Sequence, residues 1–272
     1  MRLYQLDAFA DRLFAGNPAA VCPLTEWLPA ETMQHIAAEN NLAETAFYVY
    51  NPETNRYHIR WFTPVVEVDL CGHATLATAY VIFNLEPFAG ESNQIVLDSR
   101  SGELTVCREA DGWFVLDFPA DTFQKVIVLP PALLTSFGQK PLEIYKGKTD
   151  YMLVYASQAD VEALAPDFHE LVTIPARGVM VTAPGEALSG DDDAVDFVSR
   201  FFAPQSGINE DPVTGSAHTT LIPYWAEQLG KTELMARQLS KRGGFLRCKL
   251  NPNGRVAIAG QVKLYLTGEI FV

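Results

Sequence analysis

Alternating apolar and polar residues predict that the chain is rich in strands. Residues 2–9 alternate, with Leu3 and Gln5 on one side and Tyr4 and Leu6 on the other, as in an edge or half-buried strand. Further strands are expected at residues 19–22, 45–50, 57–62, 95–98, 103–108, 113–118, 151–156, 178–183, 244–250, 255–259 and 263–271.

Helical spacing of apolar residues predicts two long helices in the first half of the chain. Residues 29–40 place Met33 and Ile36 on one face, and Gly72 opens a second helix over residues 73–84. In the second half, short helices are expected at 159–164 and 194–200, and a long one over 216–229 with Gly230 at its end. This mixture of elements indicates an α+β protein.

A weak internal repeat links the two halves of the sequence. In each half a Phe-x-Pro tripeptide is followed by a glycine that opens a helix. The matching segments are Phe62-Thr63-Pro64 with Cys71-Gly72-His73-Ala74-Thr75, and Phe202-Ala203-Pro204 with Thr214-Gly215-Ser216-Ala217-His218. Such self-similarity suggests a duplication that gives two equivalent units packed face to face.

Composition and charge narrow the classes of function. The 272 residues include 20 Lys and Arg against 33 Asp and Glu, a net charge of −13. This acidic balance speaks against a nucleic-acid surface and against an anionic membrane surface, because both require clustered cations. An apolar fraction of 48% is ordinary for a folded protein of one large or two small domains. Asp191, Asp192 and Asp193 are expected in a solvated loop.

Cysteine usage suggests the cellular compartment. Cys22, Cys71, Cys107 and Cys248 are far apart in the sequence and form no CxxC pair, so a disulfide framework is not expected. The first residues lack the apolar run of a signal peptide, and the best apolar stretch, residues 74–83, is too short to span a bilayer. We therefore expect a cytoplasmic protein with free thiols.

The glycines at the two helix starts suggest an anion site. A helix N-terminus presents unpaired N–H groups and a positive partial charge, and glycine lets a ligand approach the backbone closely. If the two halves face each other, the helix ends at Gly72 and at Gly215 and Ser216 would converge on a carboxylate or a developing enolate. The alternative is that each glycine serves a tight turn.

Glu44 is the candidate general base. It stands in the nearly apolar segment Leu42-Ala43-Glu44-Thr45-Ala46-Phe47, at the start of a predicted strand. Loss of water around a carboxylate strengthens it as a base. The commoner fate of a glutamate is a solvated position at the strand edge.

Asp211, His73 and His218 are candidates for further acid or base roles. Asp211 precedes Pro212, where an ordinary turn is the alternative, but it also lies just ahead of a helix start. Both histidines lie near helix N-termini, which disfavour the protonated imidazole, so both are expected to be neutral. A zinc site from Cys71, His73, Asp211 and His218 is conceivable, but no spacing is diagnostic and no metal is expected.

Five motifs in order carry a resemblance to a known family. They are Gly16-Asn17-Pro18-Ala19-Ala20-Val21, Asn41-Leu42-Ala43-Glu44-Thr45-Ala46-Phe47, Arg60-Trp61-Phe62-Thr63-Pro64, Cys71-Gly72-His73-Ala74-Thr75 and Glu210-Asp211-Pro212-Val213-Thr214-Gly215-Ser216-Ala217-His218. Together they resemble the PhzF (phenazine biosynthesis-like) family. The resemblance implies the diaminopimelate epimerase-like fold, with two pseudo-symmetric lobes that each wrap a curled β-sheet around a central helix. The lobes would be residues 1–119 and 120–261, with 262–272 as a candidate strand of the first.

The resemblance also implies an activity. Family members are similar to cofactor-free isomerases and are commonly homodimers, with the active site between the lobes. Glu44 matches the glutamate that moves the proton. His73 and Asp211 match other catalytic positions, and Gly72, Gly215 and Ser216 match substrate-binding ones. The expected substrate is a small carboxylate-bearing metabolite, and no cofactor is expected.

Two alternatives remain open at the level of sequence. Related epimerases and racemases use one cysteine before each helix as opposed bases, whereas here Cys71 stands at the first position and Thr214 at the second. A threonine hydroxyl is far too weak an acid to replace a thiolate, which favours the glutamate mechanism. The other alternative is a protein that binds a small acid without catalysis.

Overall fold

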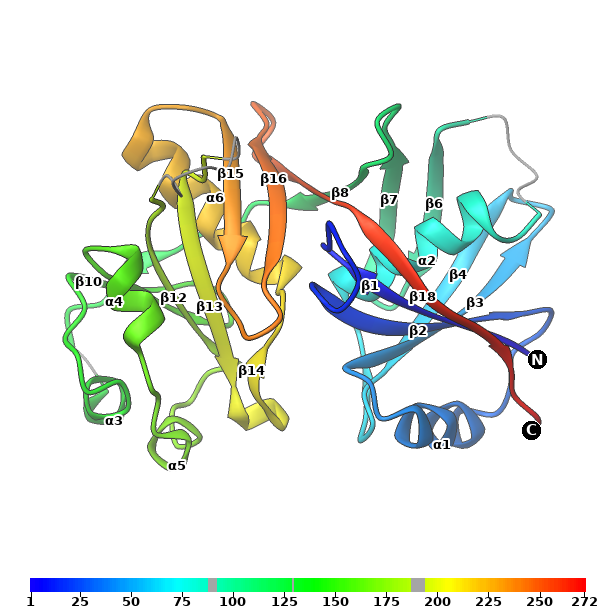
Figure 1. Ribbon diagram of the computed structural model, residues 1–272, viewed down its shortest axis with the longest axis horizontal. Coiled ribbons are helices and arrows are strands. Elements are labelled where there is room, and N and C mark those ends of the chain that lie inside the picture. The colour runs from blue at the N-terminus through cyan, green and yellow to red at the C-terminus, as the bar shows by residue number, and fades with distance from the viewer. Residues whose placement is uncertain (88–91, 129, 187–193) are drawn as a thin grey trace. The chain divides into compact units, whose positions relative to one another are not determined.

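The computed structural model describes residues 1–87, 92–128, 130–186 and 194–272 (Figure 1). The chain forms two compact units. Unit 1 comprises Met1–Phe118 and Ala257–Val272, and unit 2 comprises Pro119–Val256. The aspartates at 191–193, expected in a solvated loop, lie outside the described residues.

Unit 1 combines a mixed sheet with two helices, α1 (Ala30–Asn40) and α2 (Gly72–Asn84). Its strands are β1 (Arg2–Ala8), β2 (Asn17–Leu24), β3 (Glu44–Asn51), β4 (Arg56–Phe62), β5 (Glu67–Val68), β6 (Gln94–Ser99), β7 (Gly102–Arg108), β8 (Phe114–Pro119) and β18 (Val262–Glu269). β1 is antiparallel to both β2 and β18, so the end of the chain lies beside its beginning in this unit. β17 (Arg255–Gly260) contains the point at which the chain passes from unit 2 back to unit 1.

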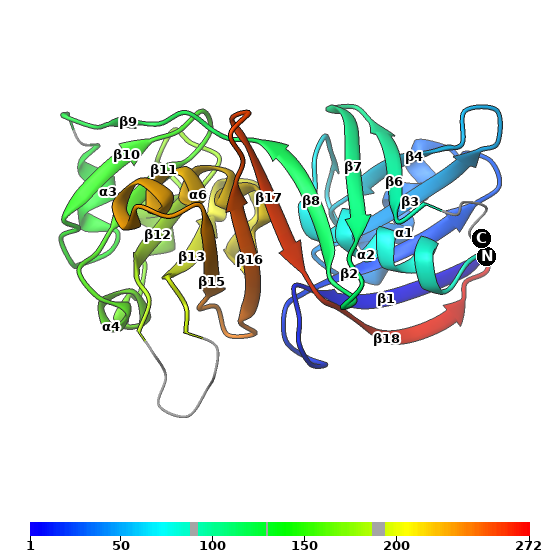
Figure 2. The ribbon, with the colours of Figure 1, turned by 90° about the horizontal axis from the view of Figure 1, so that it is seen from above.

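Helix α2 is the buried helix of unit 1. Apart from Gly72, Tyr80 and Asn84, every residue of the helix is buried, and its neighbours include β1, β2 and β3. Figures 1 and 2 show the strands of the unit around it. A helix that is apolar on all sides is stable only inside a core, so the composition of α2 accounts for its central place. α1 instead buries one face, through Met33, Ile36 and Ala37.

Unit 2 is built from further strands and mostly short helices. The strands are β9 (Gln124–Lys125), β10 (Glu143–Lys146), β11 (Tyr151–Val154), β12 (Val179–Pro184), β13 (Phe197–Ala203), β14 (Ile208–Asp211), β15 (Glu233–Gln238) and β16 (Gly244–Leu250). The helices are α3 (Pro131–Thr135), α4 (Gln158–Ala163), α5 (Phe168–Leu171), the 3-10 turn η1 (Pro204–Ser206) and α6 (Gly215–Leu229). Gly230, with φ +66°, ends α6 in the left-handed conformation that glycine tolerates best.

The strands of the two units pair in the same sequence of directions. In unit 1 the order β1-β2-β3-β4-β6-β7 pairs antiparallel, parallel, antiparallel, parallel and antiparallel. In unit 2 the order β10-β11-β12-β13-β15-β16 gives the same series. α2 precedes β6 and α6 precedes β15, so the repeated glycine motifs begin equivalent helices. The fold is a mixed α+β fold, as the sequence predicted.

One predicted helix is wrong. Residues 194–200 were expected to be helical, but Phe197–Ala203 forms strand β13, in which only Arg200 is not fully buried. β13 lies between β12 and β15, and both of its faces are covered. Such a strand is apolar without alternation, and periodicity cannot distinguish it from a buried helix.

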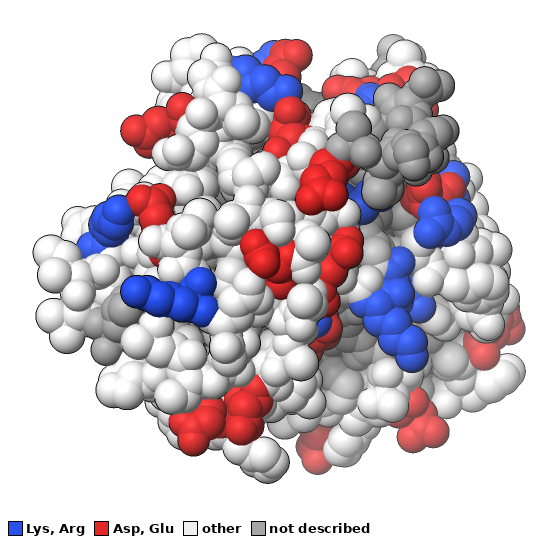
Figure 3. All heavy atoms as spheres, turned by 60° about the vertical axis from the view of Figure 1, so that its left-hand side comes forward, with Lys and Arg blue, Asp and Glu red and all other residues white. Residues whose placement is uncertain are grey.

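The surface carries charges of both signs. On the face drawn in Figure 3, Lys and Arg side chains stand in small separate groups among acidic ones. This face does not offer the clustered cations that phosphate recognition requires. Among the described residues, no helix is both long enough and apolar enough to cross a membrane.

Candidate active site

Glu44 and His73 form a close pair inside unit 1. Glu44 is the first residue of β3, and His73 stands in the first turn of α2. The His73 Nε2 atom lies 3.0 Å from Oε2 of Glu44, with side-chain exposures of 6% and 12%. At this burial a charge is screened little by water, so the carboxylate strongly favours the charged form of the imidazole.

Asn17 and Cys71 lie on the other side of the imidazole. Nδ2 of Asn17 is 3.2 Å and Sγ of Cys71 is 3.5 Å from Nδ1 of His73. Both residues are buried. The ring therefore lies between a carboxylate at one nitrogen and a thiol with an amide at the other, and its orientation is held from both sides.

A tight turn at Gly16 places Asn17 in this position. Gly16, the residue before it, has φ +65°, and a Cβ there would lie 2.2 Å from the carbonyl oxygen of Ala8. No other residue fits that backbone without a clash. The Gly16-Asn17-Pro18 motif therefore has a structural role: it begins β2 and directs the Asn17 side chain toward His73.

The surroundings of His73 shift its pKa. Burial alone would lower it, but the neighbouring Cys71 and the Glu44 carboxylate raise it well above its ordinary value. This direction opposes the effect of the helix end, because Glu44, 29 residues away in the sequence, faces the ring. Burial, with the Glu44 charge, raises the pKa of the Cys71 thiol to about 11, so the thiol stays protonated near neutral pH.

Glu44, Cys71 and His73 could also be considered as metal ligands. One potential ligand atom of each lies within 4.8 Å of the others. However, the carboxylate and the thiol face opposite nitrogens of the ring. One ion can bind only one nitrogen of an imidazole, and a thiol must lose its proton to ligate. This geometry does not favour a metal centre that uses all three residues.

In unit 2, Asp211 belongs to a loop that one buried side chain holds. Gln238 at the end of β15 is fully buried, and its Nε2 donates to the Asp211 carbonyl at 2.8 Å. Its Oε1 accepts from the Thr214 N–H at 2.9 Å. The Thr214 hydroxyl in turn donates to the Asp211 carboxylate. Asp211 is therefore fixed at both its backbone and its side chain.

Ser216 lies beside an arginine that the sequence did not single out. Nη1 of Arg177 donates to Oγ of Ser216 at 3.0 Å, and Nε donates to Oδ1 of Asp150 at 3.0 Å. The Asp150 side chain is 5% exposed and that of Arg177 is 40% exposed. A buried carboxylate thus holds a guanidinium with an accessible edge at the first turn of α6.

His218 takes a structural position. It is fully buried, and burial lowers its pKa to about 4, so it is neutral as predicted. Because the Thr214 carbonyl only accepts, Nδ1 carries the proton and donates to it at 2.9 Å. Its ring also lies 5.9 Å from that of Phe197.

Neither central helix has a side-chain cap at its start. The N-cap residues are Cys71 for α2 and Thr214 for α6, and neither side chain accepts a hydrogen bond from the helix. The helices begin at Gly72 and Gly215, so the N–H groups of the first turns lie next to the acid and base candidates in each unit. Such uncapped ends favour an anionic group.

The structure therefore brings the predicted residues together in two groups. Glu44, Gly72 and His73 share one group in unit 1, and Asp211, Gly215 and Ser216 share one in unit 2. The structure adds three residues to these groups that the sequence did not propose for the site: Asn17, Gln238 and Arg177. Gln238 had a detectable signal: it continues the inward positions Leu234 and Ala236 of an alternating strand, where a polar residue needs a partner.

Comparison with known proteins settles the family. The model of the PhzC-PhzF family, described as phenazine biosynthesis-like protein, matches residues 6–268. The chain belongs to this family. Its PhzC-PhzF relatives in Pseudomonas aeruginosa include two named uncharacterized isomerases, 48% and 49% identical over 99% of this chain and 98% of theirs. On this relationship, the chain is an isomerase.

Solved structures agree with the family and its fold. A PhzF family protein of Enterococcus faecalis is 45% identical, with a TM-score of 0.91 over 100% of this chain and 99% of that one. A probable proline racemase of Agrobacterium radiobacter is 11% identical, with a TM-score of 0.59 over 100% of this chain and 93% of that one. The second likeness concerns the fold alone, and it agrees with the predicted epimerase-like fold.

Proposed function

We propose that this PhzC-PhzF protein is a cofactor-independent isomerase that moves a proton between two carbons of a small carboxylate-bearing metabolite through Glu44. The observation that carries the proposal is the 3.0 Å contact between Glu44 and His73 in a nearly buried setting. A buried charged pair is costly to maintain for stability alone, so its presence supports a chemical role.

His73 prepares Glu44 for the reaction. Its Nε2 lies 3.0 Å from Oε2 of Glu44 and fixes the orientation of the carboxylate. Oε2 is enclosed and faces His73, so the proposed chemistry uses Oε1. The carboxylate then has one oxygen for orientation and one for chemistry.

The proton balance closes without a cofactor. Oε1 of Glu44 removes a proton from one carbon, and the C–H electron pair moves into the unsaturated or enolisable frame of the substrate. The protonated Glu44 then returns the proton to a second carbon on the same face, where a new C–H bond forms. Nothing is oxidised or reduced, and the carboxylate is regenerated.

In this proposal the other predicted residues bind the substrate carboxylate or stabilise charge that develops on the substrate. The helix starts at Gly72 and at Gly215 with Ser216 would bind the substrate carboxylate, and Arg177 adds a cation beside Ser216. His73 and Asp211 would stabilise charge as it moves to the enol or amine end. By resemblance to the family we also propose a homodimer, which sedimentation velocity can test.

Transfer of solvent deuterium tests this function. Small carboxylates are incubated with the protein in D2O, and mass spectrometry identifies any that gain deuterium at carbon or change isomer. A compound that exchanges supports a proton-moving enzyme and reveals the substrate. Binding without any exchange would instead support a protein that only binds a small acid.

A Cys71-dependent epimerase or racemase is the second candidate. Its support is the 3.5 Å contact of the Cys71 thiol with Nδ1 of His73. Two observations oppose it: the thiol pKa is raised to about 11, and Thr214 stands where the opposing thiol would be. Glu44 also has no role in a two-thiol mechanism.

A further inference from the structure

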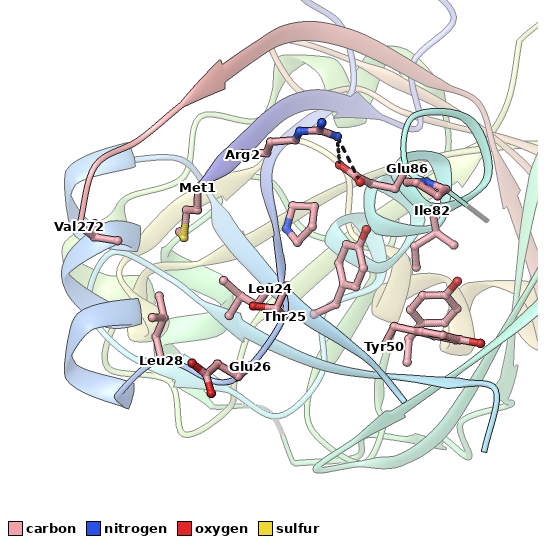
Figure 4. Close-up of a pocket in the computed structure, with 14 residues that line it drawn as sticks. Met1, Arg2, Leu24, Thr25, Glu26, Leu28, Tyr50, Ile82, Glu86 and Val272 are labelled. Carbon is pink, nitrogen blue, oxygen red and sulfur yellow. Dashed lines mark hydrogen bonds and ion pairs between the residues drawn. The ribbon is translucent and has the colours of Figure 1, made fainter. Parts of the chain in front are cut away.

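Unit 1 contains a hollow near the C-terminal end of α2 (Figure 4). Its volume is about 630 Å³, within the range of small-molecule sites. The aliphatic side chains of Leu24, Leu28 and Ile82 form part of its wall. Tyr48, Tyr50 and Tyr57 from β3 and β4 also line it. Its walls are thus mainly apolar and aromatic.

This hollow is separate from the Glu44 group. Tyr48 and Tyr50 follow Glu44 along β3 by about 13 and 20 Å at the usual strand rise of roughly 3.3 Å per residue. Ile82 lies about 13 Å from His73 along α2 at 1.5 Å per residue. The two places therefore lie toward opposite ends of the same helix and strand.

Two tyrosine hydroxyls in the hollow lack protein partners. Tyr48 and Tyr57 are 4% and 6% exposed, and their rings meet edge to face with centroids 5.8 Å apart. Neither hydroxyl forms a hydrogen bond with any residue that the structure describes, whereas the Tyr50 hydroxyl donates to Asn55 at 3.0 Å. Neither oxygen is among the enclosed polar atoms, so both hydroxyls are accessible from the hollow and free to pair with a ligand there.

The charges nearest the hydroxyls are already paired. Arg2 donates from Nη1 to both Glu86 oxygens, at 3.1 and 3.3 Å, as the dashed lines in Figure 4 show. The Tyr4 hydroxyl donates to the same carboxylate at 2.6 Å. The remaining acid of the wall, Glu26, is exposed to solvent. The groups without a protein partner in this wall are therefore neutral hydroxyls, which favours a neutral ligand over an ion.

We propose that this hollow is a second small-molecule site, for a neutral ring compound that carries a carbonyl or hydroxyl group. The ring packs between the tyrosine faces and the aliphatic wall, and its oxygen pairs with the hydroxyls of Tyr48 and Tyr57. The site is independent of the proposed isomerase function, because none of its residues belongs to the Glu44 group.

A pair of probes of similar shape tests the proposal. Coumarin has a carbonyl oxygen, and naphthalene is a fused ring of similar size without polar atoms. Titration of the full chain followed by amide NMR shifts gives both affinities. We expect coumarin to bind about 2–10-fold more tightly than naphthalene, the value of one hydrogen bond. The preference should disappear in the Tyr48→Phe, Tyr57→Phe double variant, while naphthalene binding persists.

Matched variants separate the site from general effects. Tyr80→Phe on α2 removes a hydroxyl outside the hollow and should keep the coumarin preference. Leu28→Trp should block both probes, and Leu229→Trp on α6 should block neither. The proposal is overturned if neither probe binds, if the preference survives the double tyrosine variant, or if the shifts at these residues follow protein concentration instead of probe, which would indicate a contact between copies of the chain.

Discussion

His73 holds Glu44 from the first turn of α2, with 3.0 Å between Nε2 of the imidazole and Oε2 of the carboxylate. The contact joins the start of strand β3 to the start of helix α2. Glu44 raises the pKa of His73, and burial with the Glu44 charge raises the pKa of the Cys71 thiol to about 11, so the three side chains are electrostatically linked.

Glu44→Gln is the sharpest test of the mechanism. Glutamine keeps the shape and hydrogen-bonding capacity of the side chain but cannot accept a proton from carbon. Turnover in the isomerase or deuterium-exchange assay should fall by at least ~100-fold, the lower end of general-base contributions. Binding of the carboxylate should survive, because the helix starts are unchanged.

Cys71→Ala distinguishes the glutamate mechanism from the thiol mechanism. The thiol is protonated near neutral pH, so its loss should reduce turnover far less than Glu44→Gln does. Glu31→Gln, in the exposed first turn of α1, controls for the loss of one acidic charge. An inactive Cys71→Ala together with a nearly normal Glu44→Gln would establish the thiol mechanism and refute the glutamate one.

His218 predicts a pH dependence of stability. Its folded pKa of about 4 lies below the ordinary value of 6.5, so the unfolded chain binds this proton first as pH falls. The stability that neutral His218 contributes is complete above pH 6.5 and is lost as pH falls toward 4. The full loss is about 3 kcal/mol at 1.36 kcal/mol per pKa unit.

His218→Asn isolates this contribution. The asparagine amide can donate to the Thr214 carbonyl as Nδ1 does, but it does not titrate. Urea unfolding between pH 4 and 7 should show a shallower fall in the free energy of unfolding for the variant than for the native chain. Parallel curves would mean that His218 titrates normally and that its burial is not maintained.

Gln238 is predicted to act through Asp211. Gln238→Met removes the three hydrogen bonds that join it to the Asp211–Thr214 loop and leaves buried groups unpaired, at a cost of about 1–3 kcal/mol each. If Asp211 stabilises charge in the reaction, kcat should fall about 10-fold or more with little change in KM.

Gln205→Met is the matched control for Gln238. Gln205 also donates to two carbonyls of unit 2, those of Leu171 and Ile174, but contacts no site residue. It should lower thermal stability while leaving kcat unchanged. Equal losses of kcat in both variants would show that Gln238 supports only the fold.

Local patterns predicted the elements that carry the site. Glu44 begins β3 and His73 stands in the first turn of α2, as expected, because glycine, alternation and apolar runs act over a few residues. The prediction of a helix at residues 194–200 was wrong because local patterns were its only basis. Phe197, Val198 and Phe202 of β13 are all buried, so the strand shows no alternation of apolar and polar residues.

Partners distant in sequence could not be predicted. The charge state of His73 depends on Glu44 and the hold on Asp211 depends on Gln238, which is 27 residues away. The short windows over which strand and helix patterns act do not contain both members of either pair. Their pairing follows from the order of strands, which neither propensity nor spacing specifies.

Arg177 yields the last prediction, on substrate affinity. Asp150 fixes its guanidinium beside Ser216, and an exposed edge remains for a carboxylate. Removing Arg177 alone would strand the buried Asp150 charge, so the test is the Arg177→Met, Asp150→Asn double variant. A charge-assisted hydrogen bond of about 1.5–3 kcal/mol predicts that KM rises roughly 10-fold or more. kcat should change little, since Glu44 transfers the proton in the proposed mechanism.

Asp150→Asn alone is the control: it keeps the arginine and should raise KM less. An unchanged KM in the double variant would mean that Arg177 binds only Ser216 and Asp150, and that the uncapped N–H groups of Gly215 and Ser216 bind the substrate carboxylate without it.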